Sequence, residues 1–445
     1  MARNNLIIDS LQGWRRTHFS NMINPGLNGK EVTVFGWVED IRDLGKIVFL
    51  TLRDKEGLVQ ITIHKKNVEE RILKEVDCIG KQYVIGVKGF VKANEKAPKG
   101  FEIIPSQIKI LGVAKPPLPL DPRGRVPADM KVRFDARILD LRRTVCRAIF
   151  KIRHVVLKEI RNFLYDKGYL EVNTPKIIAT ATEGGAALFP VEYFGNKAFL
   201  AQSPQLYKEQ LTSVFEKVFE IVTYFRAEEF HTRRHLNEYT SIDIEEAFVT
   251  QEDIMNTLEQ MIKFVLEKIS IECEEELKIL KRKIFIPKVS FKRVSYDEII
   301  KTLKENKVAV EWGEDIPTQG EKKIGELYKE EFFFIVDWPT AIKPFYIMPK
   351  KENEKYCHSF DLMYEGLELA SGGTRIHDYD LLVKRLKEQG LNPENFTSHL
   401  NTFKWGMPPH AGAGLGLERF LMVITGAKNI RECILFPRDK ERLYP

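Results

Sequence analysis

The first quarter of the chain consists of short segments in which hydrophobic and polar residues alternate. Five of these segments, rich in Val, Ile and Phe, lie between about residues 30 and 112, with turns at 54–57 and 96–100. Residues 67–80 break the alternation and suit a short helix. Short strands at this spacing are typical of a small closed barrel. We therefore predict a five-stranded barrel domain over residues 17–113, preceded by an N-terminal extension over residues 1–16.

A proline-rich stretch, 115–123, disfavours both helix and central strand, so we place a semi-rigid linker at 114–130. Residues 142–166 then repeat apolar positions with the 3.6-residue period of a helix, which ends at Gly168. Strand-like segments follow and surround a helical run at 251–269. This order predicts a second domain over residues 131–445, an α/β (α+β) fold with a mixed, mainly antiparallel sheet flanked by helices.

Composition adds few constraints. The 445 residues carry 69 Lys and Arg against 63 Asp and Glu, a net charge of +6 that permits a polyanionic partner without requiring one. The five cysteines lie far apart and show no zinc or disulfide pattern, so we expect free thiols in a reducing cytosol. No continuous apolar run reaches about 18 residues, and we predict neither a signal peptide nor a membrane span.

The first chemical pattern is Arg226 and Glu228, followed by a polar loop and by His235 and Tyr239 on the next strand. An arginine at a strand end can bind a phosphate with two hydrogen bonds, and an aromatic ring on the returning strand offers a face to an adenine base. Taken alone, an Arg-x-Glu pattern is more often a surface ion pair. Its neighbours make the phosphate interpretation preferable.

The second pattern is Gly412, Gly414 and Gly416, followed by Arg419 in an apolar helical run. Glycines permit a close backbone approach, and an arginine on the helix after them can hold a terminal phosphate. A dinucleotide fingerprint is the competing interpretation. We reject it because no βα unit follows to supply the acidic residue that binds the ribose.

The third pattern is Asp361, Glu368 and Ser371. A hairpin turn at 364–366 would bring Asp361 and Glu368 together across two antiparallel strands. Two carboxylates and a hydroxyl form an oxygen-only set that suits Mg²⁺ held together with substrate phosphates. The alternative is a pair of solvated acids on a sheet edge.

Taken together, the helix leading into 167–175, the Arg226–Glu228 hairpin and the segment 412–419 resemble the three signature motifs of class II aminoacyl-tRNA synthetases. The barrel resembles the OB-fold anticodon-binding domain of the subgroup for aspartate, asparagine and lysine. Segments 181–185, 202–208 and 371–375 look like the archaeal and eukaryotic aspartyl type. The resemblance covers nearly the whole chain and implies ATP-dependent activation of L-aspartate, followed by its transfer to the 3′ end of tRNA.

The resemblance also implies residue roles. Arg226 and Arg419 would be the catalytic arginines, and Mg²⁺ would be held by Asp361, Glu368 and Ser371. ATP would be bound by Arg226, Glu228, Arg234, His235, Leu236, Tyr239, Glu368, Gly416, Leu417, Glu418 and Arg419. Aspartate would be bound by Glu183, Ser203, Gln205, Lys208, Arg226, Asp243, Ser371 and Arg375.

Lys208 is the residue on which the choice of amino acid chiefly rests. Two cations, Lys208 and Arg375, converging on one carboxylate would be left under-paired by asparagine. A buried charge that loses its partner typically costs about 3–5 kcal/mol. We therefore expect asparagine to be rejected. The lysine is not expected in the corresponding asparagine enzymes.

In the barrel, Phe49 and Gln60 resemble a base-stacking aromatic residue and an anticodon-uracil reader, and Glu102 resembles a contact to the last anticodon base. A core position is the alternative for Phe49. Positions 39 and 98 bear on whether tRNA for asparagine is charged as well as tRNA for aspartate. Pro98 favours this relaxed form and Glu39 matches neither pattern, and we favour the relaxed form.

A homodimer, a cytoplasmic location and, for a relaxed enzyme, a downstream tRNA-dependent amidotransferase follow from the resemblance alone. Three other functions remain open: an asparaginyl-tRNA synthetase, a synthetase-derived asparagine synthetase, and a binding module that has kept the fold. Lys208 argues against the first and the presence of the barrel against the second. The intact Arg226, Asp361, Glu368 and Arg419 argue against the third.

Overall fold

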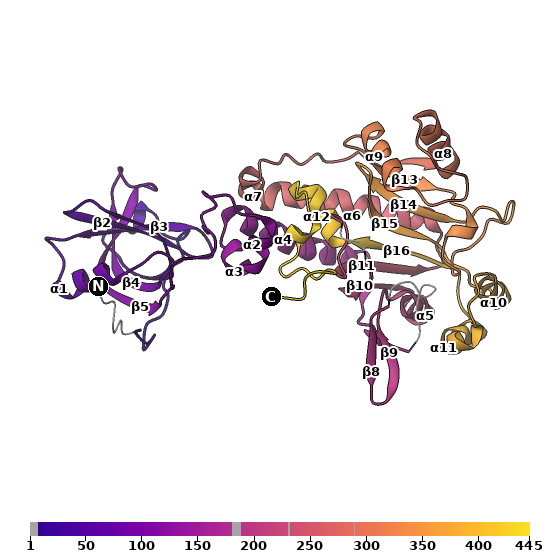
Figure 1. The fold of residues 1–445 in the computed structure, drawn as a ribbon, viewed down its shortest axis with the longest axis horizontal. Helices are drawn as coiled ribbons and strands as arrows, with labels where there is room; N and C mark the ends of the chain where they lie inside the picture. Colours follow the sequence, from indigo (N-terminus) through magenta and orange to yellow (C-terminus); the bar gives the residue numbers. More distant parts are fainter. Residues whose placement is uncertain (1–7, 180–187, 230–231, 289) are drawn as a thin grey trace. The chain divides into compact units, whose positions relative to one another are not determined.

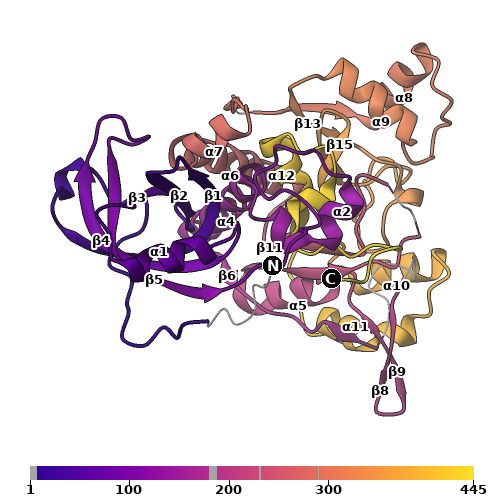
Figure 2. The same ribbon diagram turned by 60° about the vertical axis from the view of Figure 1, so that its left-hand side comes forward.

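The computed structural model describes residues 8–179, 188–229, 232–288 and 290–445. It contains two compact units, Met1–Arg125 and Val126–Pro445, so the chain divides just after the proline-rich stretch. Each unit has its own hydrophobic core. Figures 1 and 2 show the elements of both units from two directions.

The first unit is a closed five-stranded barrel in the order β1-β2-β3-β5-β4. Along its strands buried residues alternate with exposed or half-buried ones, so the inward set, including Leu50, Ile61 and Ile103, forms the barrel core. The barrel comprises β1 Glu31–Asp43, β2 Ile47–Arg53, β3 Leu58–His64, β4 Val84–Ala93 and β5 Phe101–Gly112, with η1 Pro25–Leu27 before it and α1 Glu70–Cys78 between β3 and β4.

The described part of the N-terminal extension packs on the barrel. Trp14 is 6% exposed and its ring lies 6.3 Å from that of Phe35. The ammonium groups of Lys88 and Lys109 lie 4.7 and 5.1 Å from the Trp14 ring centroid. Residues 8–16 therefore belong to the first unit, a placement that their sequence did not indicate.

The second unit is built on an eight-stranded sheet in the order β12-β13-β14-β15-β16-β11-β10-β6. Only the β12–β13 and β10–β6 pairs are parallel, so the sheet is mixed and mainly antiparallel, as predicted. Its strands are β6 Leu170–Glu171, β10 Lys217–Phe225, β11 Glu238–Ala247, β12 Lys292–Ser295, β13 Phe332–Val336, β14 Ser359–Tyr364, β15 Leu367–Thr374 and β16 His410–Gly416. A smaller sheet pairs β7 Ile177–Ile178, β9 Asn196–Leu200 and β8 Pro190–Tyr193.

The two faces of the large sheet carry different cores. One face packs against α4, α6 and α12 through residues such as Phe360, Leu362 and Leu369. The other face joins a second core that contains residues of α8, α10 and α11. The helices are α2 Met130–Asp135, α3 Arg137–Asp140, α4 Thr144–Asp166, α5 Gln205–Phe215, α6 Gln251–Glu272, α7 Glu274–Ile279, α8 Tyr296–Glu305, α9 Thr318–Leu327, α10 Tyr379–Glu388, α11 Thr397–Lys404 and α12 Leu417–Thr425, with 3-10 turns η2 Thr340–Ile342, η3 Pro393–Phe396 and η4 Ile430–Cys433.

The two long helices predicted from the periodicity, at 142–166 and 251–269, form as α4 and α6. Helix α4 buries Ile149, Ile152 and Val156 and ends before Gly168, which adopts a positive φ. Helix α6 begins with a capping box in which Thr250 and Asp253 satisfy each other's backbone amides. Among the described residues, no helix is long and apolar enough to cross a membrane.

Candidate active site

The site is laid out by the register of four neighbouring strands. Asp361 of β14 is paired with Ser371 of β15, which is paired with Gly414 of β16, which is paired with Asp243 of β11. Residues directly opposite each other in antiparallel strands share a face of the sheet. The register therefore places two acids and a hydroxyl from distant parts of the chain in one row.

The adjacent row contains Gly373, Gly412 and Glu245. A Cβ added to Gly412 would lie 2.0 Å from Glu245 Oε2 and 2.3 Å from the Ile244 carbonyl oxygen. The backbone of β16 thus passes directly against the Glu245 carboxylate, an approach that only glycine allows. The glycines predicted to permit close backbone approach do so here for a protein carboxylate.

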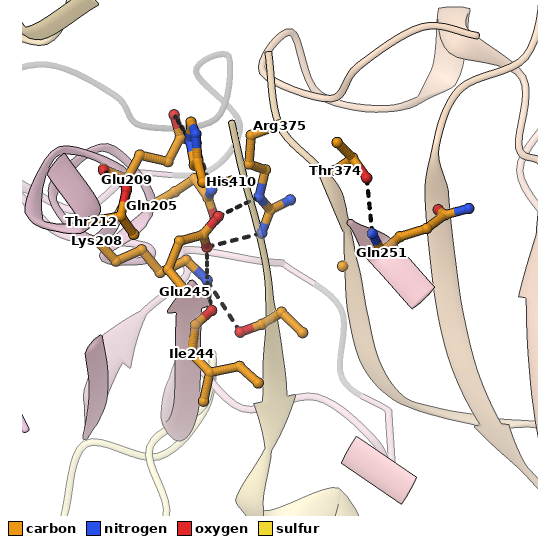
Figure 3. A network of polar contacts seen from close by, with 12 residues as sticks. Gln205, Lys208, Glu209, Thr212, Ile244, Glu245, Gln251, Thr374, Arg375 and His410 are labelled. Atoms are coloured by element: carbon orange, nitrogen blue, oxygen red, sulfur yellow. Dashed lines mark hydrogen bonds and ion pairs between the residues drawn. The ribbon is translucent and has the colours of Figure 1, made fainter. Parts of the chain in front are cut away.

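Helix α5 turns a polar face toward the sheet. Gln205, Lys208, Glu209 and Thr212 follow the i, i+3, i+4, i+7 spacing of one helix face, and all four are buried. Burying such a face is costly unless each group finds a partner. Lys208 finds its partners on β11 and β16, as Figure 3 shows, whereas Gln205 and Thr212 donate to Glu209 of the same helix.

Glu245 is the centre of a buried ion-pair network. Its carboxylate accepts hydrogen bonds from Arg375 Nε at 2.8 Å and Nη2 at 3.3 Å, and Lys208 Nζ lies 3.2 Å away (Figure 3). Lys208 also donates to Asp243 Oδ1 at 3.0 Å and to the Ala413 carbonyl at 3.1 Å. Burial lowers the pKa of Arg375, but Glu245 outweighs it, and the net effect raises that pKa. Arg375 is therefore held charged, and Lys208 is held in place by Asp243, Glu245 and the Ala413 carbonyl.

A β-bulge brings the third pattern together. Strict alternation would put Glu368 and Ser371, three residues apart, on opposite faces of β15. The pairing of β14 with β15 shifts between Leu362 and Met363, so Glu368 pairs with Met363 and joins Ser371 and Asp361 on one face. The hairpin expected at 364–366 is present.

Asp361 is 4% exposed and its Oδ1 has no hydrogen-bond partner among the described residues. Its Oδ2 accepts a hydrogen bond from Lys343 Nζ at 2.7 Å. Burial raises the pKa of Asp361, Lys343 lowers it and Glu368 raises it, with a net upward shift. An orphaned buried carboxylate oxygen beside a second carboxylate and a hydroxyl fits a hard divalent cation such as Mg²⁺.

The strand, loop, strand arrangement predicted around Arg226 is formed by β10 and β11. The Arg226 guanidinium lies 5.5 Å from the centroid of the Tyr239 ring, and its Nη1 lies 3.9 Å from Glu228 Oε1. The Tyr239 hydroxyl donates to the Gln202 carbonyl at 3.0 Å, which fixes the ring. Arginine, acid and aromatic ring are thus clustered, as the sequence indicated.

The loop after Glu228 is tied to the rest of the unit. Arg234 Nη1 donates to Glu321 of α9 and to the Gly366 carbonyl, each at 3.1 Å. His235 Nδ1 lies 2.5 Å from Thr232 Oγ1, and burial, with the arginines around it, lowers the His235 pKa. Leu236 is buried. Arg234 therefore already has acidic and carbonyl partners.

Arg419 lies at the start of α12, one turn after the glycines. Its Nη1 donates to the Glu368 carbonyl at 2.9 Å and lies 3.7 Å from Glu368 Oε1. Glu418 points the other way: it is buried and accepts from Arg153 at 2.7 Å and from the Thr240 amide at 2.9 Å. The Glu418 carboxylate therefore joins α4, α12 and β11, whereas Arg419 shares the site with Glu368.

Two further predicted residues differ in what can be said of them. Ser203 Oγ accepts a hydrogen bond from the backbone N–H of Gln205 at 3.3 Å, at the start of α5. Glu183 lies outside the described residues.

On the barrel, the predicted RNA-reading residues share the outer face. Phe49 pairs with Thr62, two residues along from the Thr51–Gln60 pair and so on the same face, and the Gln60 side-chain amide donates to Thr62 Oγ1 at 3.3 Å. Glu102 is buried and accepts from Thr62 Oγ1 at 2.6 Å and Asn94 Nδ2 at 3.1 Å. Phe49 is half-buried and outward, so the core alternative does not hold for it.

Of the two positions predicted to affect tRNA discrimination, Glu39 is ion-paired and Pro98 is exposed to solvent. Glu39 accepts from Arg53 Nε at 2.9 Å, and Pro98 is exposed in the β4–β5 turn.

Three residues of the site were not predicted from the sequence: Glu245, Glu209 and Lys343. Glu245 had a usable signal, because it lies two residues after Asp243 in a strand and shares its face. Glu209 also had one, since it follows Gln205 at i+4 in a helix. Lys343 had none, because nothing in the 18 residues between it and Asp361 fixes their contact.

Comparison with protein families agrees with this architecture. Residues 129–440 match the family described as tRNA synthetases class II (D, K and N). Residues 32–111 match the OB-fold nucleic acid binding domain.

Similar sequences cover nearly the whole length of the chain. A protein named aspartate–tRNA(Asp/Asn) ligase from Methanocaldococcus jannaschii is 52% identical over 97% of this chain and 99% of its own. One of the same name from Methanopyrus kandleri is 53% identical over 95% of this chain and 98% of its own.

Solved structures of both aspartyl and asparaginyl enzymes are similar. Asparaginyl-tRNA synthetase from Pyrococcus horikoshii, complexed with asparaginyl-adenylate, has a TM-score of 0.91 at 32% identity and covers 97% of this chain and 100% of its own. Aspartyl tRNA synthetase from Entamoeba histolytica has a TM-score of 0.84 at 32% identity, with coverages of 98% and 93%. With the family match over 129–440, these similarities show that the chain belongs to the class II tRNA synthetases of the D, K and N group.

Proposed function

We propose that this protein is an aspartate–tRNA ligase that activates L-aspartate with ATP and transfers it to tRNA for aspartate and to tRNA for asparagine. The observation that carries the proposal is the pair of buried basic side chains, Lys208 and Arg375, both ion-paired with Glu245 on the sheet face that also carries Asp361 and Ser371. Relatives named for aspartate and for both tRNAs support it.

We assign aspartate recognition to the atoms of Arg375 and Asp243 that the network around Glu245 leaves for the substrate. Glu245 engages the Nε and Nη2 edge of Arg375, so the Nη1 end remains for the substrate's side-chain carboxylate. Lys208 donates to Asp243, whose other oxygen, Oδ2, has no partner among the described residues. We assign that oxygen, with Glu183, to the substrate ammonium. Ser203, Gln205 and Ser371 complete this set, and Arg226 holds the α-carboxylate.

Activation needs positioning and charge stabilisation more than covalent chemistry. The substrate α-carboxylate attacks the α-phosphorus of ATP, and pyrophosphate leaves. Arg226 lies at the end of β10 to stabilise charge on the α-phosphate, Tyr239 offers its ring to adenine, and Arg419 holds the γ-phosphate. Glu228, Arg234, His235, Leu236, Glu368, Gly416, Leu417 and Glu418 line or support the remainder of the ATP site.

Mg²⁺ bound with ATP would be held by Asp361, Glu368 and Ser371, and it would neutralise phosphate charge. The unpartnered Asp361 Oδ1 supports this assignment. Lys343 donates a hydrogen bond to the other oxygen of Asp361, Oδ2, and so places a protein cation beside the proposed Mg²⁺ site.

For tRNA binding, we assign residues 17–113 as the anticodon-binding domain, 114–130 as the linker and 131–445 as the catalytic domain. Phe49 would stack on an anticodon base and Gln60 would read the central uracil. Glu102, fixed by Thr62 and Asn94, would accept from the last base. Pro98 and Glu39 flank this reader, and Pro98 supports charging of both tRNAs.

A homodimer, a cytoplasmic location and a partner amidotransferase complete the proposal. An enzyme that charges tRNA for asparagine with aspartate requires a later amidation step, which is why the amidotransferase is included.

ATP–pyrophosphate exchange tests the amino-acid assignment. We expect exchange with L-aspartate and at least a 100-fold lower kcat/KM with L-asparagine, from roughly 3 kcal/mol of lost pairing. Arg226→Ala is the matched inactive control. Exchange that depends on asparagine instead would replace the aspartate assignment with the asparaginyl one.

Charging of two transcripts tests the tRNA assignment. We expect labelled aspartate on both tRNA for aspartate and tRNA for asparagine at matched salt, because RNA affinity depends on salt. Charging of the first alone would make the enzyme discriminating and would remove the need for an amidotransferase.

A further inference from the structure

Behind the candidate amino-acid site lies a buried cluster formed by Glu209, His399 and His410. Glu209 of α5 is completely buried, and so is His410 of β16, while His399 of α11 is 2% exposed. Both imidazole Nε2 atoms lie near Glu209 Oε2, at 3.4 Å from His399 and 3.8 Å from His410, but neither contact has the geometry of a hydrogen bond. The roles proposed above use none of these three residues.

One hydrogen bond of His410 fixes the position of a ring proton. Its Nδ1 lies 2.8 Å from the Pro408 carbonyl oxygen, which can only accept, so Nδ1 carries a proton. The other ring nitrogen, Nε2, lies on the side of the Glu209 carboxylate.

Glu209 is an anion. Burial raises the pKa of Glu209, but His399 and His410 lower that pKa by more, so the net shift is downward. A buried carboxylate without a cation would be strongly unfavourable. The histidines therefore keep Glu209 charged in the interior.

The other oxygen of Glu209 controls Gln205. Gln205 Nε2 donates to Glu209 Oε1 at 2.6 Å, a charge-assisted hydrogen bond (Figure 3). With its NH₂ group committed to Glu209, the Gln205 amide presents its carbonyl oxygen to other partners. In aspartate the only group that can donate to such an oxygen is the α-ammonium.

We infer that Glu209, held by His399 and His410, is a positioning residue that fixes the Gln205 amide with its carbonyl oxygen directed at the substrate ammonium. This inference rests on the proposed function, because it needs an amino acid in the site. It explains why an anion is kept in the interior one residue from Lys208: a neutral partner could accept from Gln205 or donate to it, whereas a carboxylate can only accept.

The test compares Glu209→Ala with Glu209→Gln in ATP–pyrophosphate exchange by the full chain. Glu209→Ala frees the Gln205 amide to turn, so we expect the KM for aspartate to rise about tenfold and the KM for ATP to stay within about twofold. Glu209→Gln keeps an acceptor for Gln205 Nε2 but also offers a donor to the Gln205 carbonyl oxygen, so it should recover only part of the loss. If Glu209→Ala does not fold, Glu209→Met preserves the volume and is measured in its place.

Succinate, which has both carboxylates of aspartate and no ammonium, separates the ammonium contact from general damage. Its inhibition constant should change less than about twofold in Glu209→Ala, because the misplaced contact is one that succinate never makes. Equal losses for aspartate and succinate, or equal losses in the Ala and Gln variants, would overturn the inference. Absence of aspartate-dependent exchange in the unmodified protein would instead overturn the proposed function.

Discussion

Substituting Gly412 by alanine tests whether the close approach of β16 to Glu245 organises the site. Gly412 lies in an extended strand with no positive φ, so alanine fits the backbone and would by itself stabilise the strand by about 0.5–1 kcal/mol. The new methyl group, however, would lie 2.0 Å from Glu245 Oε2. An ordinary contact needs about 3.5 Å, so the carboxylate must move by roughly 1.5 Å.

Glu245 cannot make that movement and keep its partners. Its Oε2 lies 3.2 Å from Lys208 Nζ and 3.3 Å from Arg375 Nη2, and the Ile244 carbonyl blocks the methyl group from the other side. Breaking a buried ion pair costs about 3–5 kcal/mol, which the gain in the strand offsets only in part. We expect a net loss of about 2–4 kcal/mol.

Differential scanning calorimetry should show the transition of the catalytic unit lowered by roughly 3–6 °C. The matched control is Gly416→Ala, whose methyl group would meet only the Arg419 side chain at 3.7 Å, and its stability should change by no more than about 0.5 kcal/mol. Adding Glu245→Asp to Gly412→Ala shortens the acid and should restore part of the loss. Unchanged stability and unchanged aspartate KM in Gly412→Ala would refute the reasoning.

Three further predictions concern other parts of the chain. Asp140 is buried among arginines. Burial raises the pKa of Asp140, but Arg133 and Arg137 lower it by more, so the net shift is downward. The contribution of Asp140 to the free energy of unfolding is therefore present above the unfolded pKa of about 3.9 and is lost as the pH falls through the folded pKa. Asp140→Asn should therefore cost about 3 kcal/mol in urea unfolding at pH 7, and this cost should begin to fall only below about pH 4, as the pH drops toward the lowered folded pKa of Asp140; a cost independent of pH would contradict this. Cys78 is exposed, while burial raises the thiol pKa of Cys273 to about 11 and of Cys357 to about 12. A disulfide reagent at pH 8 should titrate one thiol in the folded chain and five in denaturant. Phe49→Ala should raise the KM for tRNA about tenfold in charging kinetics, from the stacking lost with one base, whereas Phe90→Ala, which removes an exposed ring from β4, should leave it unchanged.

The sequence was most informative where structure depends on local periodicity. Barrel strands, helix α4 and the β10–β11 hairpin follow from patterns of 2 or 3.6 residues, and the structure has all of them. The strand, loop, strand arrangement around Arg226 and Tyr239 also followed from the sequence, whereas the contact between Arg419 and Glu368 was not predicted. Each of these pairs lies at strand or helix ends that the alternation already located.

Sequence reasoning was weaker where position depends on pairing between distant segments. Glu245 and Arg375 are separated by 130 residues, and only the register of β11, β16 and β15 brings them together. The bulge in β15 is a second case, because strict alternation would have sent Glu368 to the wrong face. The tie between Arg234 and α9 is a third, since a helix inserted between β12 and β13 has no periodic relation to the loop it contacts.

The rows of paired residues across the sheet depend on strand register, much as a message depends on its reading frame. Asp243, Gly414, Ser371 and Asp361 share a face only because the number of residues in each of their strands keeps the register. Deleting one residue within β11 or β16 would carry the remainder of that strand's side chains to the face covered by α4, α6 and α12. Length changes between strands, such as the stretch that contains α8 and α9, leave the frame intact. Insertions and deletions in this enzyme's history should therefore concentrate between its strands, while within them evolution is confined to substitution.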